Sequence, residues 1–146
     1  MPKFGQWTYT VDREATFAAY ARSGDGGVDT CECAFCRNFR MVRSTVFPDA
    51  FLRLLDELGI DPVKDVEVWE CRGDTPGMHL YGGWYHFVGA LETSSEVSPE
   101  RFGEGFEVKL SSARTMRSDV FDGLDTVELS FFAYAVPWGL DEPDPG

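Results

Sequence analysis

Three cysteines that lie within six residues of one another are the clearest chemical signal in the sequence. Cys31, Cys33 and Cys36 form a C-x-C-x-x-C segment directly ahead of a stretch with helical periodicity. The start of a helix stabilises negative charge, because its first amide groups are unpaired and the helix dipole is positive there. Thiols at this position are therefore suited to bind a metal ion or to act as nucleophiles.

A zinc site is the interpretation that we favour. Zinc takes four tetrahedral ligands, and the cysteine segment supplies three of them. The fourth has three candidates elsewhere in the chain, namely Cys71, His79 and His86. The predicted zinc ligands are Cys31, Cys33, Cys36 and His86. Such a structural site would pin the irregular segment 24–36 to the sheet and contribute folding energy rather than chemistry, which predicts a small binding or accessory domain.

The preference for a histidine depends on a predicted hairpin. If Gly82 and Gly83 form a two-residue turn, His79 pairs directly with His86 and both rings lie on one face. One long strand with a glycine bulge would orient the two rings differently. Either histidine could also be an ordinary hydrogen-bonded residue, and Cys71 is typical of a core thiol.

Three other interpretations of the cysteines stay open. Cys33 and Cys36 have the C-x-x-C spacing of thiol redox proteins, although that motif usually follows a strand and residues 24–30 resemble a loop. An iron–sulfur cluster would need Cys71 as its fourth thiolate, and the spacings match neither common ferredoxin pattern. The cysteines could also be plain buried thiols.

Two segments together carry a resemblance to known proteins. Cys31-x-Cys33-x-x-Cys36-x-Asn38, followed by the aromatic segment 79–89 (HLYGGWYHFVG), resembles a group of small, functionally uncharacterised bacterial proteins. The resemblance covers residues 31–91. It implies that the cysteines and the Gly-Gly segment belong to one pattern, and it implies no activity.

The charge of the chain limits the classes of partner. The formal net charge is −12, from 13 Lys and Arg against 25 Asp and Glu, and the whole acidic excess lies after residue 44. Such a surface repels phosphate backbones and anionic lipids, which argues against nucleic acid and membrane partners. It favours a basic protein partner, as for an immunity-type protein that neutralises a cationic toxin.

An enzyme is a further hypothesis. A zinc ion that kept an open position for water would support hydrolytic chemistry, with His79 or His86 as ligand or proton carrier. The sequence assigns no catalytic residue and no organic cofactor. Residues 1–6 lack the pattern of a signal peptide, and the longest strongly apolar run, 131–136, is far too short to span a membrane, so we expect a cytoplasmic protein.

Helices are predicted in the front part of the chain and strands in the rest. Asp12 is a helix cap for residues 13–21, an apolar face recurs from Phe35 to Val46, and Pro48 begins a helix that ends before Gly59. Arg37, Arg40 and Arg43 share another face of the second helix, as a solvated stripe or an anion site. The predicted strands cover residues 7–11, 66–71, two stretches within 78–91, 106–110 and 127–136.

These elements predict an α+β fold, with N-terminal helices packed on one face of an antiparallel sheet formed mainly by the C-terminal half. Alternation in the last strand predicts a buried set, namely Val127, Leu129, Phe131, Ala133 and Ala135. We expect one domain over residues 1–140, a loop over 93–105, and a flexible acidic tail over 141–146.

Overall fold

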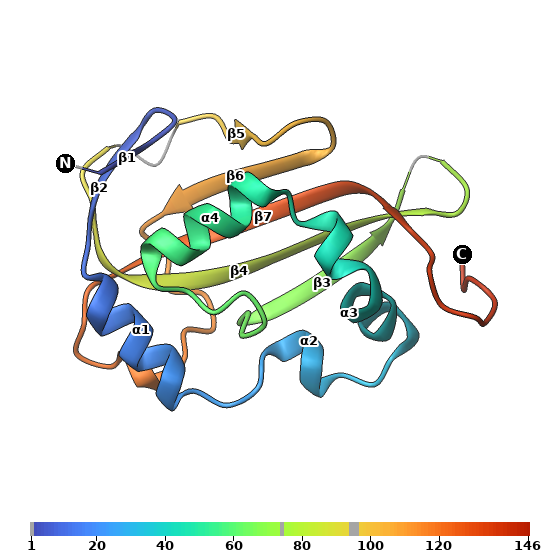
Figure 1. The fold of residues 1–146 in the computed structure, drawn as a ribbon, viewed down its shortest axis with the longest axis horizontal. Coiled ribbons are helices and arrows are strands. Elements are labelled where there is room, and N and C mark those ends of the chain that lie inside the picture. Colours follow the sequence, from blue (N-terminus) through green and yellow to red (C-terminus); the bar gives the residue numbers. More distant parts are fainter. Residues whose placement is uncertain (1, 74, 94–96) are drawn as a thin grey trace.

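A seven-stranded antiparallel sheet lies at the centre of the molecule in the computed structural model, which describes residues 2–73, 75–93 and 97–146 (Figure 1). The strand order is β1-β2-β4-β7-β6-β5, and β3 also pairs with β4. The strands are β1 (Lys3–Phe4), β2 (Trp7–Val11), β3 (Glu67–Arg72), β4 (Met78–Leu91), β5 (Glu100–Arg101), β6 (Phe106–Ser111) and β7 (Thr126–Pro137). The helices are α1 (Arg13–Arg22), α2 (Gly27–Thr30), α3 (Ala34–Val46), α4 (Asp49–Leu58) and the 3-10 helix η1 (Asp119–Phe121).

The predicted α+β fold is confirmed, and the helix ends follow their sequence signals. The Asp12 carboxylate caps α1 by accepting a hydrogen bond from the amide of Ala15 at 2.9 Å. Gly59 ends α4 in the left-handed conformation, with φ at 82°, which glycine adopts without steric cost. Pro48 lies at the N-cap of α4 rather than inside its first turn. No helix in the described part of the chain has the length and apolar character needed to cross a membrane.

The predicted hairpin at Gly82 and Gly83 is wrong, because residues 78–91 form one continuous strand, β4. The two glycines serve packing instead of a turn. Gly82 pairs with Trp69 of β3 and Gly83 pairs with Phe131 of β7, and a β-carbon at either glycine would collide with its partner's ring. Aromatic rings thus cover both faces of β4 where it lacks side chains.

One consequence concerns the two histidines. Since side chains alternate along a strand and His79 and His86 are seven positions apart, their rings lie on opposite faces of β4. The expectation that they face each other is therefore wrong.

Smaller departures also have local causes. The pairing of β4 with β7 shifts register between His79–Val136 and Tyr81–Ala133, which places one extra residue in β7. The alternation therefore changes phase, so that Ala135 is exposed and Val136 is buried, against the prediction for Ala135. The short elements α2 and β5 lie in segments expected to be loops, and residues 94–96 of the second segment lie outside the described part.

The first helix completes an edge of the sheet. Strand β4 pairs with β3 near one end and with β2 near the other, which leaves its edge open between them. There the Tyr20 hydroxyl donates to the carbonyl of His86 at 2.7 Å and accepts from its amide at 3.1 Å. Thr16 accepts from the amide of Val88 at 2.9 Å. Side chains of α1 thus replace a missing strand.

The core is aromatic and lies between the sheet and helices α3 and α4. Phe131 of β7 is fully buried at its centre. Five aromatic rings lie with centroids 5.1–6.1 Å from that of Phe131, those of Phe39, Phe47, Phe51, Phe106 and Tyr85. Helix α3, whose first turn carries Cys36, is fixed to the sheet by this cluster.

Phe131→Ala is expected to destabilise the fold by about 3–5 kcal/mol, because it leaves a cavity that five surrounding rings cannot fill. Urea unfolding measures this free energy. Phe132→Ala is the matched control, since Phe132 is half-buried on the opposite face against Trp69. Equal losses in the two variants would contradict the assignment of the core to the helix-covered face.

Candidate metal centre

The three clustered cysteines lie in the connection between α2 and α3 and at the first turn of α3. Cys33 is the N-cap of α3, and its sulfur accepts a hydrogen bond from the amide of Cys36 at 3.4 Å. The sulfurs of Cys31 and Cys33 are 3.3 Å apart. All three sulfurs lie within 4.8 Å of one another, so the structure brings together the three cysteines that the sequence pattern singled out.

This arrangement fits a single thiophilic ion. Two thiolates bound to one zinc ion at about 2.3 Å in tetrahedral geometry lie about 3.8 Å apart. The observed spread of the sulfurs includes that value, so small side-chain rotations would place all three around one ion. Within residues 2–73, 75–93 and 97–146, no fourth His, Cys, Asp or Glu joins the group at that distance.

The three thiols differ in their surroundings. The pKa of Cys31 is lowered by a hydrogen bond from the backbone of Cys33, and the side chains of Cys36 and Cys33 lower it further. The pKa of the Cys36 thiol is raised by burial and by the two neighbouring thiols. A cation bound between the sulfurs would favour the ionised form of Cys36 and so oppose the effects of burial and of the neighbouring thiols.

The arginine stripe on α3 holds the cysteine segment in place. Arg40 donates to the carbonyls of Val28 at 2.5 Å and of Cys31 at 2.7 Å. Arg37 donates to the carbonyl of Glu32 at 3.0 Å. Further along the helix, Arg43 forms an ion pair with Asp29 of α2 at 3.4 Å. The stripe is thus a set of backbone and side-chain contacts to residues 28–32 rather than a free cationic face.

A buried asparagine fixes the first turns of α3 to the sheet. Asn38 donates to the Tyr81 hydroxyl at 3.3 Å and to the carbonyl of Pro137 at 3.2 Å, and it accepts from the amide of Gly139 at 2.7 Å. The Tyr81 hydroxyl donates to the carbonyl of Phe35 at 2.7 Å. The position of the cysteines relative to the sheet therefore depends on this junction.

Two of the three candidates for a fourth ligand lie elsewhere. Cys71 is an exposed thiol on β3, on the face of the sheet opposite Tyr81 and α3. His86 is buried on that same opposite face, beside Phe121, and its Nε2 lies 3.2 Å from Glu128. Burial lowers the pKa of His86 to about 4. The geometry gives no support to His86 as a ligand of the cysteine-bound ion.

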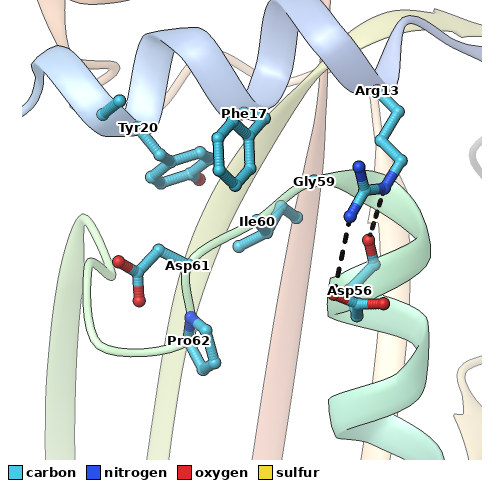
Figure 2. Close-up of a pocket in the computed structure, with 9 residues that line it drawn as sticks. Arg13, Phe17, Tyr20, Asp56, Gly59, Ile60, Asp61 and Pro62 are labelled. Atoms are coloured by element: carbon cyan, nitrogen blue, oxygen red, sulfur yellow. Dashed lines mark hydrogen bonds and ion pairs between the residues drawn. The ribbon is translucent and has the colours of Figure 1, made fainter.

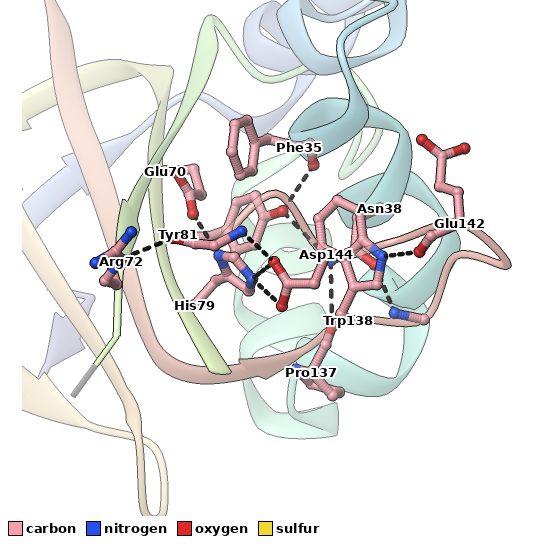
Figure 3. Close-up of polar contacts among 12 residues, drawn as sticks. Phe35, Asn38, Glu70, Arg72, His79, Tyr81, Pro137, Trp138, Glu142 and Asp144 are labelled. Carbon is pink, nitrogen blue, oxygen red and sulfur yellow. Dashed lines mark hydrogen bonds and ion pairs between the residues drawn. The ribbon is translucent and has the colours of Figure 1, made fainter. Parts of the chain in front are cut away.

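The third candidate, His79, is engaged by two carboxylates (Figure 3). Its Nδ1 forms a short contact with Glu70 of β3, and its Nε2 lies 2.9 and 3.0 Å from the carboxylate oxygens of Asp144. The ring packs near Phe35 and Trp138, with centroids 5.9 and 5.4 Å away. His79 is thus the candidate nearest to α3, but both of its nitrogens already have partners.

The acidic end of the chain, expected to extend freely into solvent, lies against the domain. Glu142 forms a bidentate ion pair with Arg37, in which the two terminal nitrogens of the guanidinium donate to the two carboxylate oxygens at 2.8 and 3.0 Å. The Arg72 side chain donates to the carbonyl of Gly146 at 2.7 Å. The composition of residues 141–146 did indicate exposure. It could not predict that basic side chains from α3, β3 and β4 contact these residues.

Sequence reasoning missed Asn38, Glu70 and Asp144 as parts of one polar network. Asn38 stands in the motif of the resemblance, which was the one signal available for it. Glu70 and Asp144 are two of many acidic residues, and only the fold places them on the same histidine.

A separate hollow lies between α1 and the segment that follows α4 (Figure 2). It measures about 400 Å³, and Arg13 and Asp56 form a 3.5 Å ion pair at one end. Phe17, which is 62% exposed, lines it. Its lining holds none of the cysteines or histidines.

The pair of His79 and Asp144 predicts a pH-dependent contribution to stability. Burial lowers the pKa of His79, but the hydrogen bonds and charges of Asp144 and Glu70 outweigh it, so the pKa is raised. A raised histidine pKa stabilises the fold fully below about pH 6.5, and this contribution is lost as the pH rises through the folded pKa. The pKa of Asp144 is lowered by the amide of Gly146 and by His79, so its contribution is lost in acid.

Asp144→Asn should therefore lower the free energy of unfolding most between about pH 4 and pH 6.5, and less above that range. Urea unfolding at several pH values measures the difference. Asp141→Asn, in the same exposed segment, is the matched control and should show no such profile. A loss in Asp144→Asn that increases with pH above 6.5 would contradict the ion pair.

Comparisons of the chain with models of protein families, with curated proteins and with solved structures found no match. The geometry of the cysteine group and its surroundings is therefore the basis on which a function can be proposed.

Proposed function

We propose that this protein is a small metal-binding domain in which the thiolates of Cys31, Cys33 and Cys36 hold one zinc ion. The observation that carries the proposal is the approach of three sulfurs to within 4.8 Å of one another at the first turn of a helix. Three thiols held so close repel one another as they ionise when no ion is present. A divalent cation bound between the thiolates offsets this repulsion, because it attracts each of them.

Zinc is the ion that this donor set favours among common divalent metals. Thiolates are soft ligands that select zinc, copper(I) and iron–sulfur clusters over magnesium or calcium. An iron–sulfur cluster needs four thiolates, and Cys71, the only other cysteine, lies on the far face of the sheet. Copper(I) is the competitor that the donor set admits, and metal analysis distinguishes the two.

The site has the features of a centre that binds an ion reversibly, and not those of a structural site on which the fold depends. Structural zinc sites are closed by four protein ligands, and here three are found in the described chain. Cys33 is exposed, so a fourth ligand from solvent can reach an ion there. Arg37 and Arg40 already hold the carbonyls of the cysteine segment, and a separate aromatic core supports the domain.

Protein purified without chelator should contain about one zinc ion per chain, and a triple Cys31→Ser/Cys33→Ser/Cys36→Ser variant should contain less than a tenth of that amount. Mass spectrometry measures the zinc content of both proteins. A thiol titration that finds all four thiols in the unchanged chain shows that its cysteines are reduced. Cys71→Ser is the matched control, because Cys71 lies outside the group, and it should retain the zinc. Loss of zinc in Cys71→Ser, or a metal-free unchanged chain, would refute the site.

A second arm of this test addresses the reversible character of the site. Arg40→Gln leaves the donor set intact but removes the contacts to the backbone of Val28 and Cys31, and it should weaken zinc binding about 10–100-fold. Arg53→Gln, an exposed arginine of α4, should leave it unchanged. Chelation should remove the ion without cooperative unfolding of the domain, and unfolding upon chelation would show a structural site instead.

A further inference from the structure

The acidic end of the chain contacts the domain as a bound peptide would. In Figure 3, residues 138–146 lie over the end of the sheet where β3 and β4 meet the start of α3. Glu142 contacts Arg37 of α3, Asp144 contacts His79 of β4, and the carbonyl of Gly146 accepts from Arg72 of β3. Acceptors at alternate positions of the segment thus meet cationic side chains from three different elements.

Side chains, and not a backbone ladder, hold this segment. Pairing of β7 with β4 ends at Pro137, and each contact of residues 141–146 with the domain described above uses a side chain of the domain. Five of these six residues are exposed, Asp144 being the exception. Pro143 and Pro145 favour extended backbone, which lowers the entropy lost when the segment docks.

His79 is arranged as a carboxylate receptor at the centre of this site. Its side chain is 2% exposed, and Glu70 holds Nδ1, so the ring has a fixed orientation with Nε2 directed at Asp144. Arg37 and Arg72 contact the residues two positions before and two positions after Asp144, and Glu70 is the acidic partner of His79. A cavity of about 470 Å³ lies beside His79 and Asp144 and extends along residues 75–78.

The three side chains that hold the segment are basic, although the molecule as a whole is acidic. The chain carries a net charge of −12, with almost twice as many acidic as basic residues. An imidazole and two guanidinium groups that contact one segment on such a surface suit a carboxylate ligand.

We propose that Arg37, His79 and Arg72 form a binding site for acidic peptide segments, and that residues 141–146 occupy it as an intramolecular ligand. The ligand class is an extended peptide with carboxylates two residues apart, as at Glu142 and Asp144. A segment of a partner would enter by displacing the resident segment, which is tethered through residues 138–140. A short tether gives an effective concentration in the millimolar range, so a free peptide must overcome this competition.

The test uses the full chain with its resident segment weakened. E142Q/D144N keeps the length and shape of the segment but removes the two carboxylates. The probe is the hexapeptide Asp-Glu-Pro-Asp-Pro-Gly, the sequence of residues 141–146, and the readout is the ring signal of His79 in NMR spectra. The chain has two histidines, and the buried His86 reports whether the fold is intact.

The hexapeptide should shift the His79 signal in E142Q/D144N and reach saturation, with an affinity at least tenfold higher than in the unchanged chain. D125N removes an exposed carboxylate that contacts Arg114 elsewhere and should behave like the unchanged chain. A hexapeptide with Asn, Gln and Asn in place of the acids should give no shift. Adding Arg72→Gln to E142Q/D144N should lower the peptide affinity at least fivefold.

The proposal is overturned if about 10 mM hexapeptide leaves the His79 signal of folded E142Q/D144N unchanged. This concentration exceeds the millimolar effective concentration of the tethered segment. Equal affinities for the acidic and the amide peptide would overturn it as well. If the His86 signal shows that E142Q/D144N is unfolded, the single variant D144N replaces it with the same expectations. Metal binding at the cysteines is not involved in this test, so the two proposals fail independently.

Discussion

The junction made by Asn38 is the interaction on which the arrangement of both sites depends. Its buried side chain joins the first turns of α3 to Tyr81 of β4 and to the backbone that follows β7. A buried amide that loses its partners costs about 1–3 kcal/mol, so none of these elements can move away from the others without penalty. Cys36 precedes Asn38 by two residues on α3, and His79 precedes Tyr81 by two residues on β4. Gly139, which Asn38 holds, lies two residues before the acidic segment.

The periodicity of the sequence was sufficient to predict most of the fold. The capped helix after Asp12, the amphipathic helix that ends at Gly59 and the alternating strand after Thr126 all have local signals, which can be recognised without knowing the tertiary contacts. The Gly82–Gly83 pair misled the prediction because the same two residues suit a hairpin turn and a strand packed beneath aromatic rings. The choice between them depends on Trp69 and Phe131, which are distant in sequence.

The candidate site was predictable in its ligands and not in its surroundings. Three thiols within six residues must lie close in any fold, so the cysteine group could be found from spacing alone. The contribution of Arg40 could not be predicted from spacing, because a stripe of arginines on a helix does not reveal which carbonyl groups they contact. The partners of His79 could not be predicted either, since Glu70 lies on a neighbouring strand and Asp144 lies near residue 146. A basic protein partner stays a prediction from charge, and a cytoplasmic location stays a prediction from the sequence pattern of residues 1–6 and the short apolar runs.

The proposed metal centre holds one ion with three thiolates and leaves a fourth position open to solvent. X-ray absorption at the zinc edge, on protein purified without chelator, measures this coordination most directly. We predict three sulfur neighbours at about 2.3 Å and one oxygen or nitrogen at about 2.0 Å. Two sulfur neighbours or fewer would contradict the three-thiolate site, and four sulfurs would contradict its open position.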